Sequence, residues 1–300
     1  MGRHRAFTTL HSTLRLSGGG NCLSLSTGDN AQSLNSQLIK AARNGNLQRV
    51  TLLIQRGADV NSSNDAHQTP LIKAAEDGYT ELVVRLLKMG ADPSVVDKRG
   101  STALHYAAYN GHCDAVTALV EAGVPVNGVN KFGYSALHYA CADGQAEAVD
   151  HLVSLGADVN LADKMGWVAL HRAASGGYTD TIRNLVKHGA LVQGVGSVRS
   201  YSPLHEAVWH RQEAAVRELV ALGALAEQPD EWDTSPADLA RSQFVAGDAD
   251  MLALLRELGQ LHNTSVPDLP GPPAPPAPSA PPAPPEPGVR APPGPEAVRT

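Results

Sequence analysis

The sequence predicts an all-α solenoid of seven helix–turn–helix units with β-turn fingers, flanked by disordered tails. Three observations predict this fold class. Two segments lying 33 residues apart nearly superimpose, TALHYAAYNGHCDAV from Thr102 and SALHYACADGQAEAV from Ser135. Three ladders of equivalent residues keep that period along the chain, and periods of this size are typical of stacked repeats. The composition is rich in small apolar residues and only 4% aromatic, which suits short, closely packed helices.

The first set of equivalent residues lies at the start of the first helix of the repeats, and all but one of its members are Ser or Thr. Its members are Ser36, Thr69, Thr102, Ser135, Val168, Ser202 and Ser235. Ser and Thr are favoured N-cap residues, and proline follows at the first helical position in three repeats, where a missing N–H costs nothing. Val168 lacks the capping hydroxyl, so the fifth repeat is expected to lose about 0.5–2 kcal/mol of stability there.

Two glycine ladders mark the turn between the helices and the end of the second helix. They are Gly45, Gly78, Gly111, Gly144 and Gly177, and Gly57, Gly90, Gly123, Gly156, Gly189 and Gly223. Glycine readily takes the left-handed conformation that closes a helix. Neither helix is long enough to be stable alone in water, so each repeat must bury its apolar face against its neighbours.

These motifs resemble the ankyrin repeat. The residues that carry the resemblance are TALHYAA at Thr102–Ala108, SALHYAC at Ser135–Cys141, SPLHEAV at Ser202–Val208, and GADVN at Gly57–Asn61 and Gly156–Asn160. The resemblance covers residues 34–262 as seven repeats. The first is more polar and the seventh departs from the glycine spacing, so these two are expected to act as caps. It implies a stack that binds other proteins.

The two ends of the chain differ in composition from the repeats. Residues 1–33 are predicted to be disordered, although their arginines and the absence of acids before Asp29 are also typical of an organellar transit peptide. Residues 263–300 hold fifteen of the 21 prolines and are predicted to be a disordered, extended tail. This tail is either a solvated spacer or a ligand for a proline-recognition domain.

Charge and cysteine content exclude several classes of function. The net charge of −6 offers no basic excess for nucleic acid, and no run of 18 apolar residues could span a membrane. Cys22, Cys113 and Cys141 form no C-x-x-C pair, which favours a reducing intracellular compartment, cytoplasmic or also nuclear. We expect a monomer.

The histidines do not predict a catalytic or metal site. His105, His138, His171 and His205 occupy the same repeat position, where the resemblance implies hydrogen bonds to local backbone and to the capping hydroxyl. Stacked repeats would hold them about 8–10 Å apart, too far for one metal ion. No phosphate loop, metalloprotease motif or nucleophile elbow is present, so no catalytic residue, cofactor or metal is expected.

The residues that differ between repeats predict the binding surface. In an ankyrin-like stack the finger tips and the residues before the inter-helix glycine face the partner. The candidates are Lys98, Arg99, Tyr109, Lys131, Phe132, Tyr134, Lys164, Met165, Trp167, Arg199, Tyr201, Trp209 and Trp232. Exposed aromatic and arginine side chains are typical hot spots, and a column of lysines favours an acidic element in the partner.

These observations predict a non-enzymatic scaffold or adaptor that binds a protein or peptide with acidic and apolar components. Two alternatives stay open: an inhibitory or regulatory subunit of an enzyme or transcription factor, and an enzyme with an unrecognised site. The resemblance also implies that Asn61 and Asn160 are candidates for hydroxylation, because similar ankyrin repeats are substrates of an asparaginyl hydroxylase. The structural alternative is that each asparagine only shapes its turn.

Overall fold

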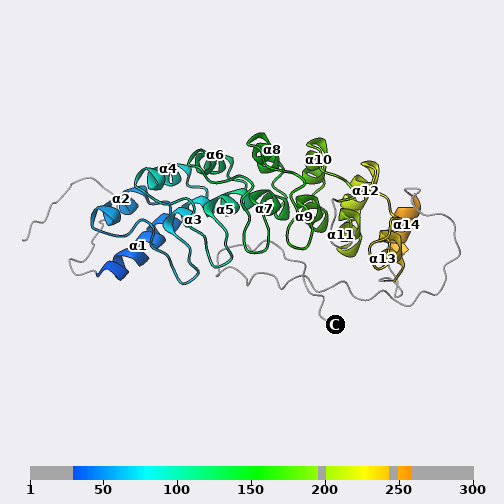
Figure 1. Ribbon diagram of the computed structural model, residues 1–300, viewed down its shortest axis with the longest axis horizontal. Coiled ribbons are helices and arrows are strands. Elements are labelled where there is room, and N and C mark those ends of the chain that lie inside the picture. Colours follow the sequence, from blue (N-terminus) through cyan, green and yellow to red (C-terminus); the bar gives the residue numbers. More distant parts are fainter. Residues whose placement is uncertain (1–29, 195–200, 243–248, 258–300) are drawn as a thin grey trace, which may run out of the picture.

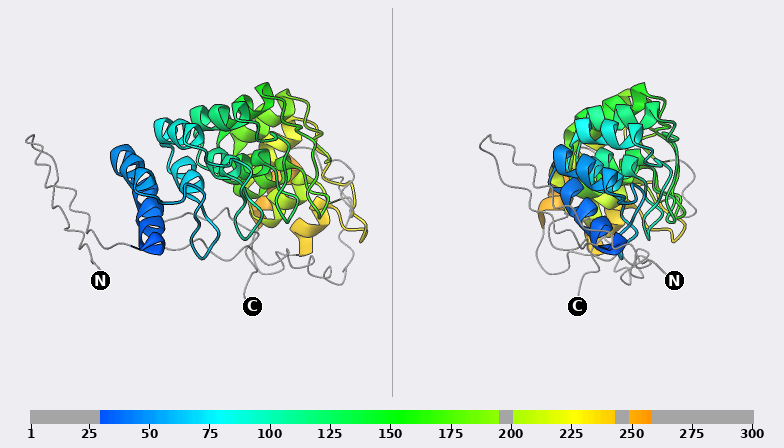
Figure 2. Two further views of the ribbon diagram at one scale, coloured as in Figure 1. Left: turned by 60° about the vertical axis from the view of Figure 1, so that its left-hand side comes forward. Right: turned by 90° about the vertical axis from the view of Figure 1, so that its left-hand side faces the viewer.

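The computed structural model is a curved stack of helix pairs (Figures 1 and 2). It describes residues 30–194, 201–242 and 249–257, and this part of the chain contains fourteen helices and no strand, apart from one isolated bridge between Val129 and Ser135. The fourteen helices form the seven predicted pairs, so the all-α solenoid is confirmed. Within the described residues, no helix is long and apolar enough to cross a membrane.

The first helices of the repeats form an inner row and the second helices an outer row. The inner helices are α1 (Ala31–Arg43), α3 (Pro70–Glu76), α5 (Ala103–Tyr109), α7 (Ala136–Ala142), α9 (Ala169–Gly176), α11 (Pro203–Trp209) and α13 (Pro236–Ser242). The outer helices are α2 (Leu47–Gln55), α4 (Thr80–Lys88), α6 (Cys113–Glu121), α8 (Ala146–Ser154), α10 (Thr179–Lys187), α12 (Glu213–Ala221) and α14 (Ala249–Glu257). The loops that join one repeat to the next extend from one side of the stack as fingers (Figure 1).

Local sequence explains where these helices begin and end. The Thr69 hydroxyl accepts a hydrogen bond from the backbone N–H of Ile72 at 3.3 Å and so caps α3. Gly111 turns the chain between α5 and α6 with a φ of 74°, as its ladder predicts. In the sixth repeat Arg211 takes this turn position with a φ of 56°, a conformation that costs a side-chain-bearing residue more than glycine.

The core lies between the two rows of helices. Alanines such as Ala107, Ala140 and Ala173 are fully buried at the contacts between successive inner helices, where their small side chains let the backbones approach closely. Leu119 and Leu152 on the outer helices are also fully buried. Each repeat therefore buries its apolar face mainly against its neighbours, and stability depends on the interfaces between repeats.

The first repeat begins earlier than the sequence predicts. Asn30 caps α1 by accepting a hydrogen bond from Ser33 N at 2.8 Å, and the helix starts at Ala31, ahead of the predicted domain boundary at residue 34. The sequence did not predict this extra turn, because polar residues at the start of the first repeat interrupt the apolar periodicity by which helices are recognised. The rest of the predicted N-terminal tail, and the whole proline-rich tail, lie outside the described residues.

Candidate functional site

In four of the repeats, one Asp or Asn side chain holds the finger in shape. In the third repeat, Asp97 Oδ1 accepts hydrogen bonds from the N–H groups of Arg99 and Ser101, both at 2.8 Å. Asn130, Asp163 and Asp230 do the same in the fourth, fifth and seventh repeats. These acceptors hold the tip residues of the four fingers in the same conformation, so the variable side chains project from equivalent places.

Main-chain hydrogen bonds join the fingers to one another. Lys98 N donates to Ala66 O at 3.1 Å, Lys131 N donates to Arg99 O at 2.9 Å, and Lys164 N donates to Phe132 O at 3.2 Å. The tips of repeats two to five therefore form one connected edge. We call the tip side chains of repeats three to five the finger strip: Lys98, Arg99, Lys131, Phe132, Lys164 and Met165.

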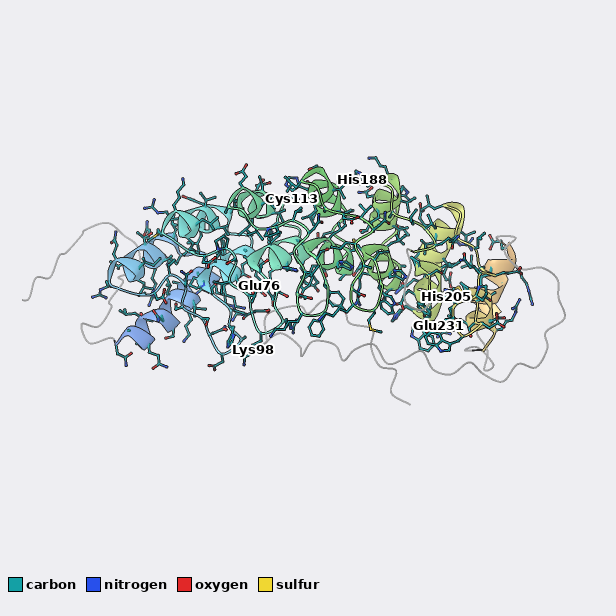
Figure 3. All side chains as sticks on the ribbon, viewed as in Figure 1. Glu76, Lys98, Cys113, His188, His205 and Glu231 are labelled. Atoms are coloured by element: carbon teal, nitrogen blue, oxygen red, sulfur yellow. The ribbon has the colours of Figure 1, made fainter. Side chains whose placement is uncertain are left out.

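The finger strip carries positive charge in contact with solvent. Its three lysines are exposed, and Lys131 Nζ donates to Lys98 O of the preceding finger at 2.8 Å. Arg99, Phe132 and Met165 are half-buried. The seventh finger differs in sign, because Glu231 and Asp233 flank Trp232, whose side chain is 38% exposed. Lys98 and Glu231 lie on the finger side of the stack, whereas Cys113 and His188 lie on the outer helices (Figure 3).

An aromatic column, Tyr134, Trp167 and Tyr201, lies at the base of these fingers. The rings of Trp167 and Tyr201 stack at 6.2 Å between centroids. Tyr134 and Trp167 are joined by Arg172, whose guanidinium carbon lies 4.5 Å from the Tyr134 ring centroid and 5.3 Å from that of Trp167. Trp167 is half-buried, so part of it remains available to a ligand.

Arg172 connects the aromatic column to the finger strip. Its guanidinium donates to the Tyr134 hydroxyl and lies 3.6 Å from Asp163 Oδ2. Asp163 Oδ1 meanwhile accepts from Met165 N and Trp167 N, at 2.7 and 3.0 Å. Burial raises the pKa of the Asp163 carboxyl, while backbone N–H donors and Arg172 act to lower it. Asp163 therefore fixes both the fifth finger and the arginine beneath Trp167.

Two of the predicted contact residues are buried, whereas the sequence predicts them to be exposed. Tyr109 is only 2% exposed and packs edge-on against Tyr139, with 6.3 Å between centroids. Tyr201 is 6% exposed because it lies between Trp167 and His205, at 4.7 Å from the His205 ring. Both rings lean onto a neighbouring repeat, where they bury more apolar area than they would in solvent. Trp209 is half-buried against the core, and Arg199 lies outside the described residues.

Sequence analysis missed Arg172, although a signal was present. Arg172 follows His171, at the position where the third and fourth repeats have Tyr106 and Tyr139, both buried. Arginine in a column of buried residues needs partners for its charge, and only the structure shows that Tyr134 and Asp163 provide them.

The four repeat histidines are structural, as the resemblance implied. His138 Nε2 lies 3.1 Å from Trp167 O, and its Nδ1 lies 2.9 Å from the Ser135 hydroxyl. Because a carbonyl only accepts, Nε2 carries the proton, and Nδ1 accepts from the capping residue. Burial lowers the pKa of His138 to about 3 and that of His105 to about 4. Within the described residues, no group of three or more His, Cys, Asp or Glu side chains is placed to hold a metal ion.

Asn61 and Asn160 join successive repeats. Asn61 Nδ2 donates to Gly90 O at 3.3 Å, and its Oδ1 accepts from Asp92 N at 2.8 Å. Asn160 makes the equivalent pair of bonds to the repeat that follows it: its Nδ2 donates to Gly189 O, and its Oδ1 accepts from Leu191 N, both at 3.1 Å. Both asparagines therefore shape the loops and link neighbouring repeats, whatever modification they receive.

Comparison with protein families now agrees with this geometry. The family described as ankyrin repeats (three copies) matches residues 38–130, 71–163, 122–194 and 137–230, which together span more than half of the chain. The chain belongs to the ankyrin-repeat family. Ankyrin repeats are generally protein–protein interaction modules and are typically non-enzymatic. A comparison with curated proteins finds no match.

Proposed function

We propose that this ankyrin-repeat protein is a non-enzymatic scaffold or adaptor that binds a protein segment along the finger strip and the aromatic column. The observation that supports the proposal is the connected edge of repeats two to five. Because main-chain hydrogen bonds fix the fingers relative to one another, the strip and Trp167 are already arranged before a partner arrives. Such preorganisation lowers the entropy lost on binding.

The chemistry of the strip defines the partner. Lys98, Lys131 and Lys164 attract acidic side chains, and because they are exposed they act mostly through association rate and salt dependence. Phe132, Met165 and Trp167 provide apolar contacts close to those charges. The partner therefore combines acidic and apolar residues. The acidic seventh finger repels such a charge, so the acidic part of the segment lies over repeats three to five.

Proximity labelling in cells tests this proposal. The triple variant Lys98→Glu/Lys131→Glu/Lys164→Glu reverses three exposed charges, and we expect it to keep its helical circular dichroism while it loses a discrete set of labelled proteins. Trp167→Ala should lose an overlapping set. Lys187→Glu, on the exposed face of α10, is the control and should lose none. An unchanged set with the triple variant would contradict the proposal, and activity assays on the lost partners would separate an adaptor from an inhibitory subunit.

We also propose that Asn61 and Asn160 are hydroxylated in cells. Both side chains lie on loops and are only half-buried, which supports access by a modifying enzyme. Mass spectrometry of protein purified from its native cells should show one added oxygen on a peptide containing either residue. Unmodified peptides covering both positions would contradict this prediction.

A further inference from the structure

The outer helices carry a second repeating pattern, on the face away from the proposed groove. Here we call the contact between two successive outer helices an outer seam. Four of the six seams are bridged by polar side chains. At α6–α8 the Thr117 hydroxyl lies 2.7 Å from His151 Nε2, and at α8–α10 Asn184 Nδ2 donates to Asp150 Oδ2 at 3.0 Å. Arg183 pairs with Glu218 at 2.8 Å across α10–α12, and Arg217 pairs with Glu257 at 3.1 Å across α12–α14.

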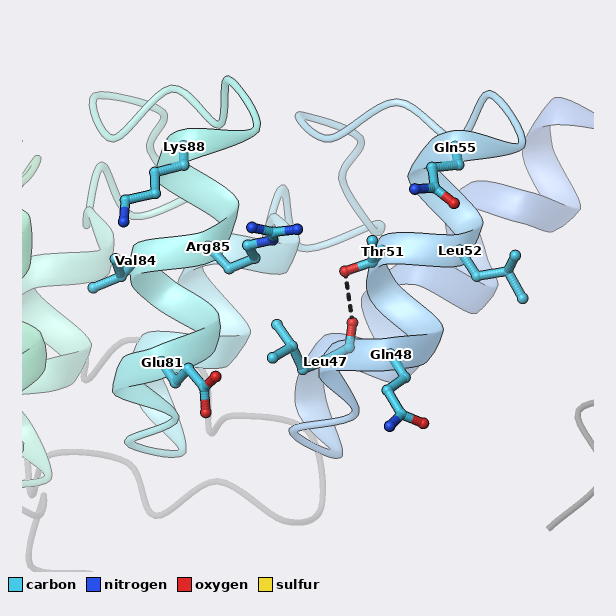
Figure 4. Close-up of a pocket in the computed structure, with 9 residues that line it drawn as sticks. All are labelled: Leu47, Gln48, Thr51, Leu52, Gln55, Glu81, Val84, Arg85 and Lys88. Carbon is cyan, nitrogen blue, oxygen red and sulfur yellow. Dashed lines mark hydrogen bonds between the residues drawn. The ribbon is translucent and has the colours of Figure 1, made fainter. Parts of the chain in front are cut away.

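The α2–α4 seam differs from all the others. The α4–α6 seam has no polar bridge among the described residues, but its helices pack directly, as do those of the bridged seams. Between α2 and α4 there is neither close packing nor a bridge. A hollow of about 510 Å³ lies there instead, lined by Leu47, Leu52, Val84, Arg85, Lys88 and other residues of the two helices (Figure 4).

The residues that should bridge this seam are Thr51 and Arg85, which occupy the repeat positions of Thr117 and His151. Thr51 donates its hydroxyl to Leu47 O at 2.9 Å, within its own helix. Arg85 is exposed, and its side chain makes no hydrogen bond or ion pair with any described residue. Its side chain extends into the gap toward α2 (Figure 4). The position that Glu218 fills opposite Arg183 therefore has a cation here and no carboxylate.

The charge of the hollow selects its occupant. Arg85 and Lys88 outweigh the one acid of the lining, Glu81, and Leu47 and Leu52 are half-buried apolar side chains beside them. The chain's own first 29 residues are a poor match, because they contain Arg3, Arg5 and Arg15 and no acid before Asp29. An acidic segment from another protein has the complementary charge.

We propose that the hollow between α2 and α4 docks an acidic, amphipathic helix of a partner protein. Its carboxylates pair with Arg85 and Lys88, and its apolar side chains pack on Leu47 and Leu52. A groove between two helices is a common receptor for such a helix. This surface goes beyond the proposed function, because it lies on the outer helices and not on the finger strip or the aromatic column.

A peptide-display selection tests the proposal. The probe is a library of helical peptides of about 16 residues, roughly four turns, with Ala, Leu, Gln, Lys, Asp and Glu allowed at each position. It is selected on the full chain carrying Lys98→Glu/Lys131→Glu/Lys164→Glu, so that the finger strip no longer attracts acidic peptides. We expect binders enriched in acids and with leucines spaced three or four residues apart. The best binder should lose at least about tenfold in affinity with Arg85→Glu, and also with Leu52→Glu.

Lys187→Glu is the matched control and should leave the affinity of the peptide unchanged within about twofold, because it reverses an exposed lysine on α10, away from the hollow. The Arg85 side chain has no partner among the described residues, so Arg85→Glu should keep the circular dichroism of the native chain. Three results would overturn the proposal: binders that do not depend on Arg85, binders enriched in lysine, or Arg85-dependent self-association in sedimentation velocity, which would assign the hollow to a second copy of the chain.

Discussion

At the residue scale, the buried histidines make stability depend on pH. The folded pKa values of His105 and His138, about 4 and about 3, lie below the value of about 6.5 expected when unfolded. Between these limits the unfolded chain binds protons that the folded chain does not, so acid favours unfolding. We expect the free energy of unfolding to fall by about 1.4 kcal/mol per pH unit for each such histidine as pH drops below 6.5. Urea denaturation at pH 7.5, 6 and 5 measures this slope.

The carboxylates allow the cause to be checked. Burial raises the folded pKa of Glu76 and of Asp163, so these groups favour the folded state as they are protonated, which is the opposite sign. Because their protonation favours the folded state, the loss of stability between pH 6.5 and 5 belongs to the histidines. A His138→Gln variant lacks one of these histidines, so its free energy of unfolding should fall less steeply with pH, by about 1.4 kcal/mol per pH unit. A free energy that stays constant from pH 7.5 to 5 would contradict the assignment of neutral, buried imidazoles.

Val168 offers a stabilising substitution. It is fully buried and stands where other repeats have a hydroxyl, and only its backbone N–H reaches His171 Nδ1, at 3.1 Å. In the fourth repeat the Ser135 hydroxyl reaches the equivalent nitrogen at 2.9 Å. Val168→Thr should add this bond with little change in volume and raise the free energy of unfolding by about 1 kcal/mol. Val168→Ala, the control, should lower it, and a loss of stability in the threonine variant would show that the hydroxyl is not satisfied.

At the element scale, the fingers depend on glycines that touch the next finger. Gly133 has a φ of 88°, and a Cβ built there would lie 2.6 Å from Lys164 N. Gly156 has a similar φ of 94°, but nothing lies within 4 Å of its would-be Cβ. Both alanine variants pay about 1–2 kcal/mol for the left-handed backbone. Gly133→Ala should cost at least about 1 kcal/mol more, because it displaces the neighbouring finger. Equal losses in urea denaturation would mean that the fingers are not tightly joined.

The fingers also mark how far sequence predicts this binding surface. The period of the repeat placed Lys98, Lys131 and Lys164 at equivalent, exposed tips, because a repeated backbone puts equivalent residues in equivalent places. It could not predict the burial of Tyr109 and Tyr201. A ring at a groove position either projects outward or leans onto the adjacent repeat, and the size of the neighbouring side chains decides which.

At the scale of the whole molecule, the sequence predicts which repeats are neighbours but not how tightly each pair packs. The outer position of Arg85 follows from its place in the repeat. Its lack of a partner depends on the separation of α2 and α4, which is a property of two helices and their loops together. Because each repeat contacts only its neighbours, one loose seam weakens the end of the stack without loosening its middle.

This local weakness predicts uneven hydrogen exchange. The helix α2 packs on α1 but has no close outer neighbour, whereas α8 is packed between α6 and α10. The free energy of the opening that allows exchange should therefore be smaller for amides of α2 than for amides of α8.

The double variant Thr51→Arg/Arg85→Glu copies the Arg183–Glu218 pair into the loose seam. An exposed pair contributes up to about 1 kcal/mol, so α2 exchange should slow by at most about fivefold while α8 exchange stays unchanged. Arg85→Glu alone, which makes no pair, should not slow it. Equal protection of α2 and α8 in the native chain would show that the α2–α4 seam is closed in solution, and that no docking hollow exists there.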